Sequence, residues 1–295
     1  MSATAERLPE RYWKRVERQL PLLGRKNQER IAATRLTIIG CSGNGSPTAL
    51  VAALTGFRHL TLVDGDRLSL SNLNRFTLGG LQDVGDYKVD TAKRTLEARF
   101  PELRIRAIAK DVRAPGVLPK ASACDWMIDA TDNDTTRRFL HQHCRNAQIP
   151  LISLGSGFLG HCGAITAAGC RVNRVRRGDA CLECQVLDEA PMPQARASLV
   201  IPNIIAAALA VDLLVREITA YDVAGTLVPT SIEGPGADDI HGRACIPEPD
   251  GRNAIYFDLL ARRIHTTRVV PRPDCPICGT GSPQPLATRP EDECQ

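Results

Sequence analysis

A glycine-rich segment between residues 40 and 47 has the composition of a phosphate-binding turn. An apolar run at 35–39 ends at Gly40, and Cys-Ser-Gly-Asn-Gly-Ser follows before Pro47 and a second apolar stretch. Glycines at a strand-to-helix junction let backbone N–H groups approach a phosphate at the positive end of the helix. The segment therefore favours nucleotide binding, with a tight turn that binds nothing as the open alternative.

The spacing of these glycines argues against two common nucleotide motifs. A Walker loop ends in Gly-Lys-Ser/Thr, whereas Gly45 is followed by Ser46 and Pro47. A dinucleotide fingerprint, Gly-x-Gly-x-x-Gly, needs glycine where this chain has Ser42. Asp64, about 24 residues beyond the first glycine, does suit an acid that binds a ribose. The pattern indicates a nucleotide site that fits a nicotinamide-dependent oxidoreductase poorly.

Two C-x₂-C pairs, Cys181/Cys184 and Cys275/Cys278, are the strongest metal signal among the 11 cysteines. Each short turn sets two thiolates for one half of a tetrahedral site, so together they predict a closed, structural Cys₄ zinc site. A thioredoxin-like redox pair and coincidence are the rival interpretations. Cys245 is a weak candidate for a thioester acceptor, and the other six cysteines are expected to do no chemistry.

Alternating apolar runs and amphipathic stretches predict the elements that carry these residues. Strands are expected at 35–40, 59–63, 103–109, 126–129 and 150–154. Helices are expected at 47–55, with Ser46 as N-cap, and at 88–100, 135–147 and 202–219. Later strand candidates are 162–169, 254–257 and 263–270. Strand–helix alternation of this kind predicts a parallel sheet with helices on both faces.

Four charged or polar motifs complete the pattern. The glycine loop is followed, in order, by Asp64-Gly-Asp66, Ser71-Asn-Leu-Asn-Arg75, Asp86-Tyr-Lys88 and Asp129-Ala-Thr-Asp-Asn133. With these motifs the chain, from about Arg18 to Cys278, resembles the ThiF/MoeB/HesA family of ubiquitin-activating-enzyme-like adenylyltransferases. The resemblance implies an α/β fold: a Rossmann-like mixed sheet, largely parallel in its N-terminal half, with antiparallel C-terminal strands and a Cys₄ zinc site.

The resemblance also implies a role for each matching residue. The implied catalytic residues are Arg18, Arg75, Lys88 and Asp132. The implied ATP-binding residues are Gly40, Gly43, Gly45, Ser46, Asp64, Asp66, Asn72, Arg75, Lys88 and Asp132. In this scheme Asp132 ligates Mg²⁺, and Arg18 reaches into the site of a partner subunit, which implies a homodimer. The chain departs from the family pattern at Cys41, Asn44 and Phe76.

The chemistry of adenylation agrees with such a residue set. A carboxylate attacks the α-phosphate of ATP and pyrophosphate leaves, so both reactants are anions and catalysis is chiefly positioning and charge neutralisation. Mg²⁺ needs only one or two protein carboxylates besides phosphate oxygens. Two cations, Arg75 and Lys88, would stabilise the leaving group without any general base.

The composition limits the class of protein and the kinds of partner that the chain can have. The chain has 295 residues, 43% hydrophobic and 24% charged, with a net charge of +4, so it is a folded protein with no strong argument for nucleic acid or membrane as partner. No signal-peptide core is evident near the N-terminus, and a cytoplasmic location is expected. Three parts are predicted: a helical arm at 1–34 that carries the arginine finger, an adenylation domain at 35–279 and a disordered tail at 280–295.

The expected function is ATP- and Mg²⁺-dependent adenylation of the C-terminal carboxylate of a ubiquitin-like or sulfur-carrier small protein. Because no cysteine lies between Gln185 and Val200, hand-off of the activated acceptor to another protein is favoured. A tRNA-modifying dehydratase and a peptide-adenylating enzyme are alternatives within the family. A nicotinamide oxidoreductase is the alternative from a different class.

Overall fold

A mixed sheet of eight strands organises the part of the protein that the structure describes. The computed structural model describes residues 7–161, 164–185, 198–219, 253–275 and 277–278. Within these residues the strand order is β3-β2-β1-β4-β5-β6-β7-β8. The parallel half consists of β1 (Arg35–Ile39), β2 (His59–Val63), β3 (Arg104–Ile108), β4 (Trp126–Asp129) and the start of β5 (Leu151–His161). The antiparallel half adds β6 (Ala164–Val175), β7 (Ala254–Asp258) and β8 (Arg263–Thr267). The predicted fold class is confirmed.

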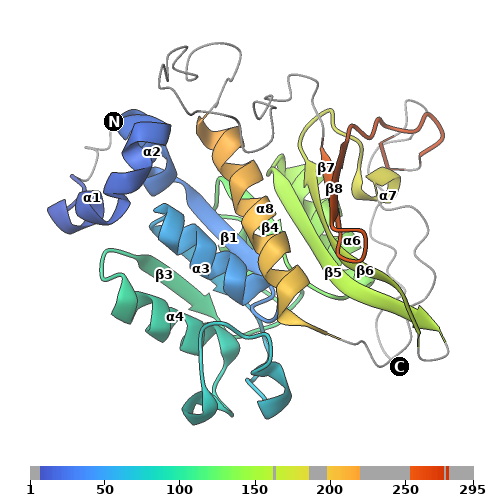
Figure 1. Cartoon of the computed structure of the whole chain (residues 1–295). Coiled ribbons are helices and arrows are strands. Elements are labelled where there is room, and N and C mark those ends of the chain that lie inside the picture. Colours follow the sequence, from blue (N-terminus) through green and yellow to red (C-terminus); the bar gives the residue numbers. More distant parts are fainter. Residues whose placement is uncertain (1–6, 162–163, 186–197, 220–252, 276, 279–295) are drawn as a thin grey trace, which may run out of the picture.

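Helices cover both faces of the parallel half, as expected (Figure 1). One face carries α3 (Gly45–Thr55), α4 (Lys88–Arg99) and α8 (Val200–Thr219), whose apolar side chains share one core with Leu36 and Ile38. The other face carries α5 (Val117–Ala121) and α6 (Asp134–Ala147), which pack on Ile39 and Met127. Alternate residues of β1 therefore enter opposite cores, as the two-residue period of a strand requires.

The first crossover helix begins two residues earlier than the sequence predicted. α3 starts at Gly45 with Asn44 as its N-cap, and it ends at Gly56, whose φ of +113° suits glycine. The expected N-cap, Ser46, lies inside the helix instead. Its hydroxyl donates to the carbonyl of Ser42 at 2.7 Å, so it serves the turn that precedes it. The prediction of Ser46 as N-cap was wrong because the helix already begins at Gly45, which precedes it.

The hairpin that follows the parallel strands is longer than predicted. β5 continues through His161 and pairs with β6 from Ala164 to Val175, where the sequence indicated strands at 150–154 and 162–169. Glycines interrupt the apolar pattern of β5 from Gly155 onward, and for this reason the sequence predicted that the strand ends at residue 154. Gly155 lies opposite Arg171, whose side chain passes over it, and a Cβ at Gly155 would meet that side chain at 2.7 Å.

An N-terminal arm packs against the far end of α3. It consists of α1 (Glu10–Val16), the 3₁₀ turn η1 (Glu17–Gln19) and α2 (Leu20–Ala33). The hydroxyl of the buried Tyr12 donates to Gly56 O at 3.0 Å, and Arg15 Nη1 donates to Ala53 O at 2.8 Å. The arm is helical, and besides the C-terminal end of α3 it contacts Glu102 through Arg15 and the end of α8 through Arg30.

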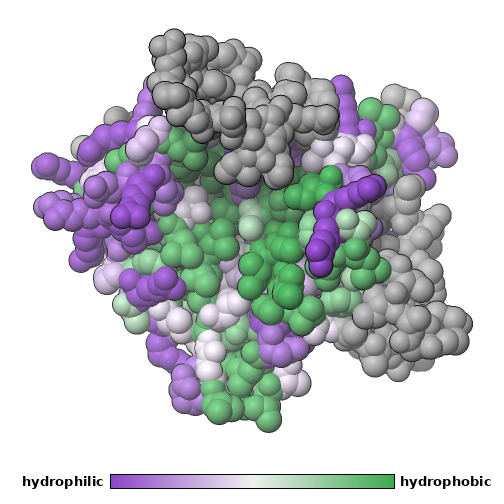
Figure 2. All heavy atoms as spheres, viewed as in Figure 1, coloured by the Kyte–Doolittle hydropathy of each residue, from purple (hydrophilic) through white to green (hydrophobic). Residues whose placement is uncertain are grey.

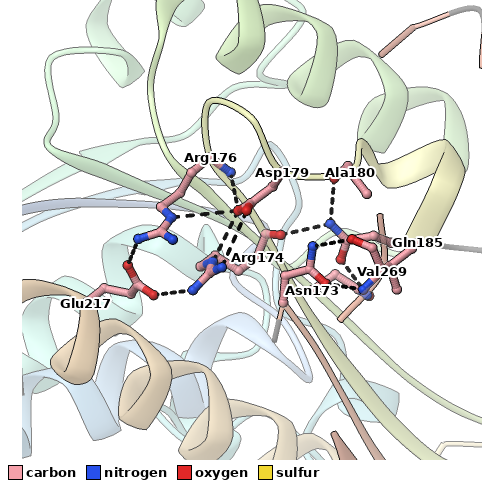
Figure 3. A network of polar contacts seen from close by, with 9 residues as sticks. Asn173, Arg174, Arg176, Asp179, Ala180, Gln185, Glu217 and Val269 are labelled. Atoms are coloured by element: carbon pink, nitrogen blue, oxygen red, sulfur yellow. Dashed lines mark hydrogen bonds and ion pairs between the residues drawn. The ribbon is translucent and has the colours of Figure 1, made fainter. Parts of the chain in front are cut away.

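A buried polar network ties β6, α7 (Leu182–Gln185) and α8 together (Figure 3). Arg174 on β6 pairs with Glu217 on α8 and, through Nε, with Asp179 at 3.2 Å. Arg176 pairs with the same two carboxylates from the solvent side. The amide of Gln185 donates to Arg174 O at 2.9 Å and to Ala180 O at 2.7 Å. These contacts position both the cysteine-bearing turn and the long helix α8.

Candidate functional site

The carboxyl ends of β1, β2 and β4 surround a cavity of about 740 Å³. Such a crevice is where open α/β sheets bind ligands. Eight of the predicted site residues line it: Gly40, Gly43, Asp64, Asp66, Asn72, Arg75, Lys88 and Asp132. Three others do not belong to the lining: Gly45, Ser46 and Arg18. The tertiary structure thus gathers residues that are separated by up to about 90 positions in the sequence.

Close packing of backbone on backbone shapes the glycine loop. A Cβ at Gly45 would lie 1.8 Å from Gly40 O, so residue 45 must be glycine. Gly40 has a φ of +85°, and a Cβ there would meet Ala130 O, just past the end of β4, at 3.0 Å. The N-terminal end of α3 therefore opens towards the cavity, where its N–H groups suit a phosphate. Ser46 supports the loop from inside, since its Oγ also accepts the N–H of Thr77 at 3.1 Å.

Asp64 is held by the backbone on both carboxylate oxygens. Oδ2 accepts the N–H of Cys41 at 2.6 Å and Oδ1 accepts the N–H of Asp66 at 2.8 Å. Burial raises the pKa of Asp64 above the usual value for an aspartate, and Lys88 and the two N–H groups partly oppose that rise. The carboxylate is fixed in direction, and its oxygens keep lone pairs for further hydrogen bonds.

Two cations approach the cavity from the segment after β2. Lys88, the first residue of α4, is buried, and its ammonium binds Asp66 Oδ2 at 2.7 Å. Asp66 itself is 74% exposed, so a phosphate can compete with it for the ammonium. Arg75 is anchored by Nη1, which donates to Ser71 O and Asn74 Oδ1, both at 2.9 Å. Asn72 caps its own turn, with Oδ1 accepting the N–H of Ser69 at 3.2 Å.

Buried polar groups on both sides hold the turn that carries Asp132. Below it, Asp129 Oδ1 accepts the N–H and the hydroxyl of Thr131 at 3.0 and 2.6 Å, and Oδ2 accepts the hydroxyl of Ser153. Above it, the guanidinium of Arg137 donates to Thr131 O at 2.6 Å and to Leu154 O at 3.2 Å. Asp132 is exposed and lines the cavity. The residue before it, Thr131, is held through both its N–H and its carbonyl oxygen.

Sequence reasoning missed three polar residues in the cavity wall. Asn44, Ser156 and Asn203 come from the glycine loop, β5 and α8, and their side chains are mutually hydrogen bonded. Asn44 was noted only as a departure from the family pattern. No local spacing connects three residues that lie as much as 159 positions apart.

Arg18 lies away from this cavity of the same chain. It is exposed on η1, in the arm that contacts the C-terminal end of α3. Since α3 has 11 residues, its two ends are about 16 Å apart at 1.5 Å per residue. The glycine loop is at the opposite end of this helix.

Four cysteines meet beside β6. Their sulfur atoms all lie within 4.8 Å of one another, with Cys181–Cys275 at 3.4 Å, Cys184–Cys278 at 3.5 Å and Cys181–Cys184 at 3.8 Å. Tetrahedral zinc with Zn–S distances of about 2.3 Å requires sulfur atoms about 3.8 Å apart. The cluster therefore fits a metal ion with four thiolate ligands. His141, on the neighbouring α6, accepts the N–H of Leu182 at 3.4 Å.

The cysteines outside this cluster that the structure describes are poor nucleophiles. Cys41, Cys144 and Cys170 are buried and Cys124 is partly buried. Burial raises the pKa of Cys144 to about 12 and that of Cys170 to about 11, so both thiols stay protonated. Cys245, the acceptor candidate, lies outside the described residues, as does the predicted tail at 280–295.

Within the described residues, none of the helices has the length and apolar character needed to cross a membrane.

Comparisons with known proteins show the family of the chain. A model of the ThiF family matches residues 16–229. The SAMP-activating enzyme E1 of Haloferax volcanii is 26% identical over 264 residues, which cover 88% of this chain and 85% of that protein. Adenylyltransferase and sulfurtransferase MOCS3 of Mus musculus is 28% identical over 276 residues, or 92% of this chain and 53% of that protein.

Further similarities extend over shorter regions or concern the fold. The molybdopterin-synthase adenylyltransferase of Haemophilus influenzae is 33% identical over 126 residues, or 43% of this chain and 52% of that protein. The chain thus spans about half the length of two of these three relatives. The crystal structure of E. coli MccB with MccA shares the fold with a TM-score of 0.69 at 20% identity, over 93% of this chain and 76% of that one. The chain belongs to the ThiF family and is an enzyme of the adenylyltransferase type that its named relatives represent.

Proposed function

We propose that this protein uses ATP and Mg²⁺ to adenylate the C-terminal carboxylate of a ubiquitin-like or sulfur-carrier small protein. One observation carries the proposal: a glycine loop at a helix N-terminus, a ribose-type acid, two cations and a metal-type acid surround a single cavity. Relatives named for activation of SAMP and for molybdopterin synthase support this class of acceptor.

Each side chain has a defined task in this reaction. Asp64 holds the ribose, and the glycine loop with the N-terminal end of α3 holds the phosphates. A carboxylate oxygen of the acceptor bonds to the α-phosphorus while the bond from that phosphorus to the leaving pyrophosphate breaks. Arg75 and Lys88 neutralise the charge that develops on the pyrophosphate. Asp132 would hold Mg²⁺, which supplies further neutralisation of the phosphate oxygens when bound.

The same proposal includes a homodimer in which Arg18 acts in the partner's site. Apolar side chains gather over α3 and α8 on the face shown in Figure 2. Leu54 on α3 and Ile201 and Ile204 on α8 are large apolar side chains that are 42–48% exposed, so a partner could cover them. In a dimer that covers this face, Arg18 of each copy would approach the cavity of the other copy, although it lies far from the cavity of its own chain.

Hand-off of the adenylated acceptor to another protein completes the proposal. No cysteine stands between Gln185 and Val200, and burial keeps Cys144 and Cys170 protonated. A zinc ion held by the four-cysteine cluster would have a structural task only, because its four ligands leave no open position.

ATP–pyrophosphate exchange tests the proposal directly. The purified chain is assayed with candidate small proteins that end in glycine, with short peptides and without an acceptor. We expect exchange with a small protein, loss of exchange in Asp132→Ala with an unchanged thermal melt, and partial recovery when Arg18→Ala and Asp132→Ala chains are mixed. Exchange with peptides alone would favour the peptide-adenylating alternative. ATP binding without exchange for any acceptor would refute the enzyme assignment, and quenching or enhancement of NADH fluorescence would favour the oxidoreductase.

A further inference from the structure

Three polar side chains from distant segments form one corner of the cavity. Ser156 Oγ donates to Asn44 Oδ1 at 2.8 Å, and Asn203 Nδ2 donates to Asn44 Oδ1 and to Ser156 Oγ, both at 2.8 Å. Asn44 stands in the glycine loop and Asn203 in the first turn of α8. α3 and α8 lie side by side with their N-terminal ends together (Figure 1). We refer to Asn44, Ser156 and Asn203 as the amide corner.

The amide corner leaves one acceptor and one donor unused. Asn203 is only 5% exposed, yet its Oδ1 is buried without a hydrogen-bond partner among the residues that the structure describes. Both side-chain hydrogen bonds of Asn44 are accepted by Oδ1, so Nδ2 donates no hydrogen bond within the described part of the chain. A buried, unsatisfied polar atom in a native protein requires an explanation, because most such atoms are paired.

An unused amide oxygen and an unused amide N–H on two side chains that are hydrogen bonded to each other can together serve one residue of an extended peptide. In such a residue the N–H and the C=O point to the same side, as they do in an antiparallel pair. The Asn44 amide is attached to the phosphate loop, between Gly43 and Gly45, so a C=O bound there would be next to the phosphates. The peptide residue that meets both conditions is the last one of the acceptor tail.

We infer that the amide corner binds the terminal residue of the acceptor. Asn203 Oδ1 accepts the backbone N–H of that residue, and Asn44 Nδ2 donates to the carboxylate oxygen that does not attack. The amide torsion of an asparagine is broad, so Asn203 can turn Oδ1 towards the tail without movement of α8. Its Nδ2 then gives up its bonds to Asn44 Oδ1 and Ser156 Oγ, while Ser156 keeps its own bond to Asn44. The inference deepens the proposed function and depends on it. Asn203 is a positioning residue in this scheme, and an acceptor that ends in a residue without an N–H is disfavoured.

Two acyl-adenylate mimics test this assignment without turnover. The probes are 5′-O-[N-(acetyl-Gly-Gly)sulfamoyl]adenosine and the same compound with the terminal glycine replaced by N-methylglycine. Their binding to the full chain is measured by calorimetry, and 5′-O-sulfamoyladenosine reports on the nucleotide site alone. In the native protein we expect N-methylation to weaken binding about tenfold, the effect of one lost hydrogen bond of about 1.4 kcal/mol.

The decisive comparison is between variants. In Asn203→Leu, and in Asn203→Ala should the leucine variant not fold, the two probes should bind equally within about twofold, while sulfamoyladenosine still binds. Asp212→Asn is the control, because it changes an exposed residue of the same helix but no member of the amide corner, and it should keep the tenfold difference. No penalty in the native protein, or the same penalty in the Asn203 variants, would overturn the inference. If sulfamoyladenosine fails to bind the native protein, the proposed function falls with it.

Discussion

Arg174 and Arg176 provide a matched pair for a test of how burial sets the value of an ion pair. Both arginines contact Glu217 and Asp179, as Figure 3 shows. The side chain of Arg174 is 5% exposed and that of Arg176 is 44% exposed. Each is replaced by glutamine, which shortens the side chain and removes the charge in both cases.

The expected costs differ because the two sites differ in solvation. Glu217 and Asp179 are only 12% and 15% exposed. Removal of Arg174 leaves these carboxylates with the exposed Arg176 as their remaining ion-pair partner among the described residues, and breaking a buried pair costs about 3–5 kcal/mol. Arg176→Gln leaves the buried pairs intact, so its cost falls in the range of exposed pairs, about 1 kcal/mol or less.

Urea unfolding at pH 7.5, followed by circular dichroism, measures both variants. A loss of about 3 kcal/mol shifts the midpoint by about 1 M for an m-value of about 3 kcal/mol/M. We expect a shift of that size for Arg174→Gln and a shift about three to five times smaller for Arg176→Gln. Equal shifts, or a larger one for Arg176→Gln, would show that burial of the network does not govern its contribution.

Three further predictions concern the loop, the buried histidine and the cysteine cluster. Gly45→Ala puts a Cβ 1.8 Å from a backbone oxygen, so the loop must distort. We expect ATP binding, measured by calorimetry, to weaken more than about 100-fold, which corresponds to a loss of about 2.8 kcal/mol of binding free energy. In Gly43→Ala the new Cβ meets only side-chain atoms, at 3.0 Å, so the loss of ATP affinity should be far smaller. Burial lowers the pKa of His141 from 6.5 to about 4, so the unfolded chain takes up its proton first as pH falls. The free energy of unfolding therefore falls as the pH drops through 6.5, by about 1 kcal/mol between pH 7.5 and 5.5. In His141→Gln this contribution to the pH dependence should be absent when urea unfolding is measured at the two pH values. Cys275→Ser should abolish binding of about one zinc per chain, measured by elemental analysis, and lower stability by several kcal/mol, whereas Cys170→Ser should retain the metal.

Local chemistry in the sequence was sufficient for much of the site. The glycine loop was predictable because a strand-to-helix turn around a phosphate needs small residues at adjacent positions, and Gly45 proves unable to carry a Cβ. The four-cysteine cluster was predictable because its members come as two short pairs, each formed by a local turn. Strand–helix alternation likewise predicted the parallel half of the sheet, because each crossover needs a helix.

Relations between distant residues were decided only by the tertiary structure. Ser46 was expected to cap a helix and to contact ATP, but packing turned its hydroxyl towards Ser42 and Thr77. Arg18 was expected to serve as a catalytic residue, but the arm that carries it packs against the C-terminal end of α3, away from the cavity. Asn44 and Asn203 meet across 159 positions because α8 packs against α3. Spacing along the chain encodes turns and ligand pairs, whereas the contacts of one helix with another depend on the shape of both surfaces, which no local pattern contains.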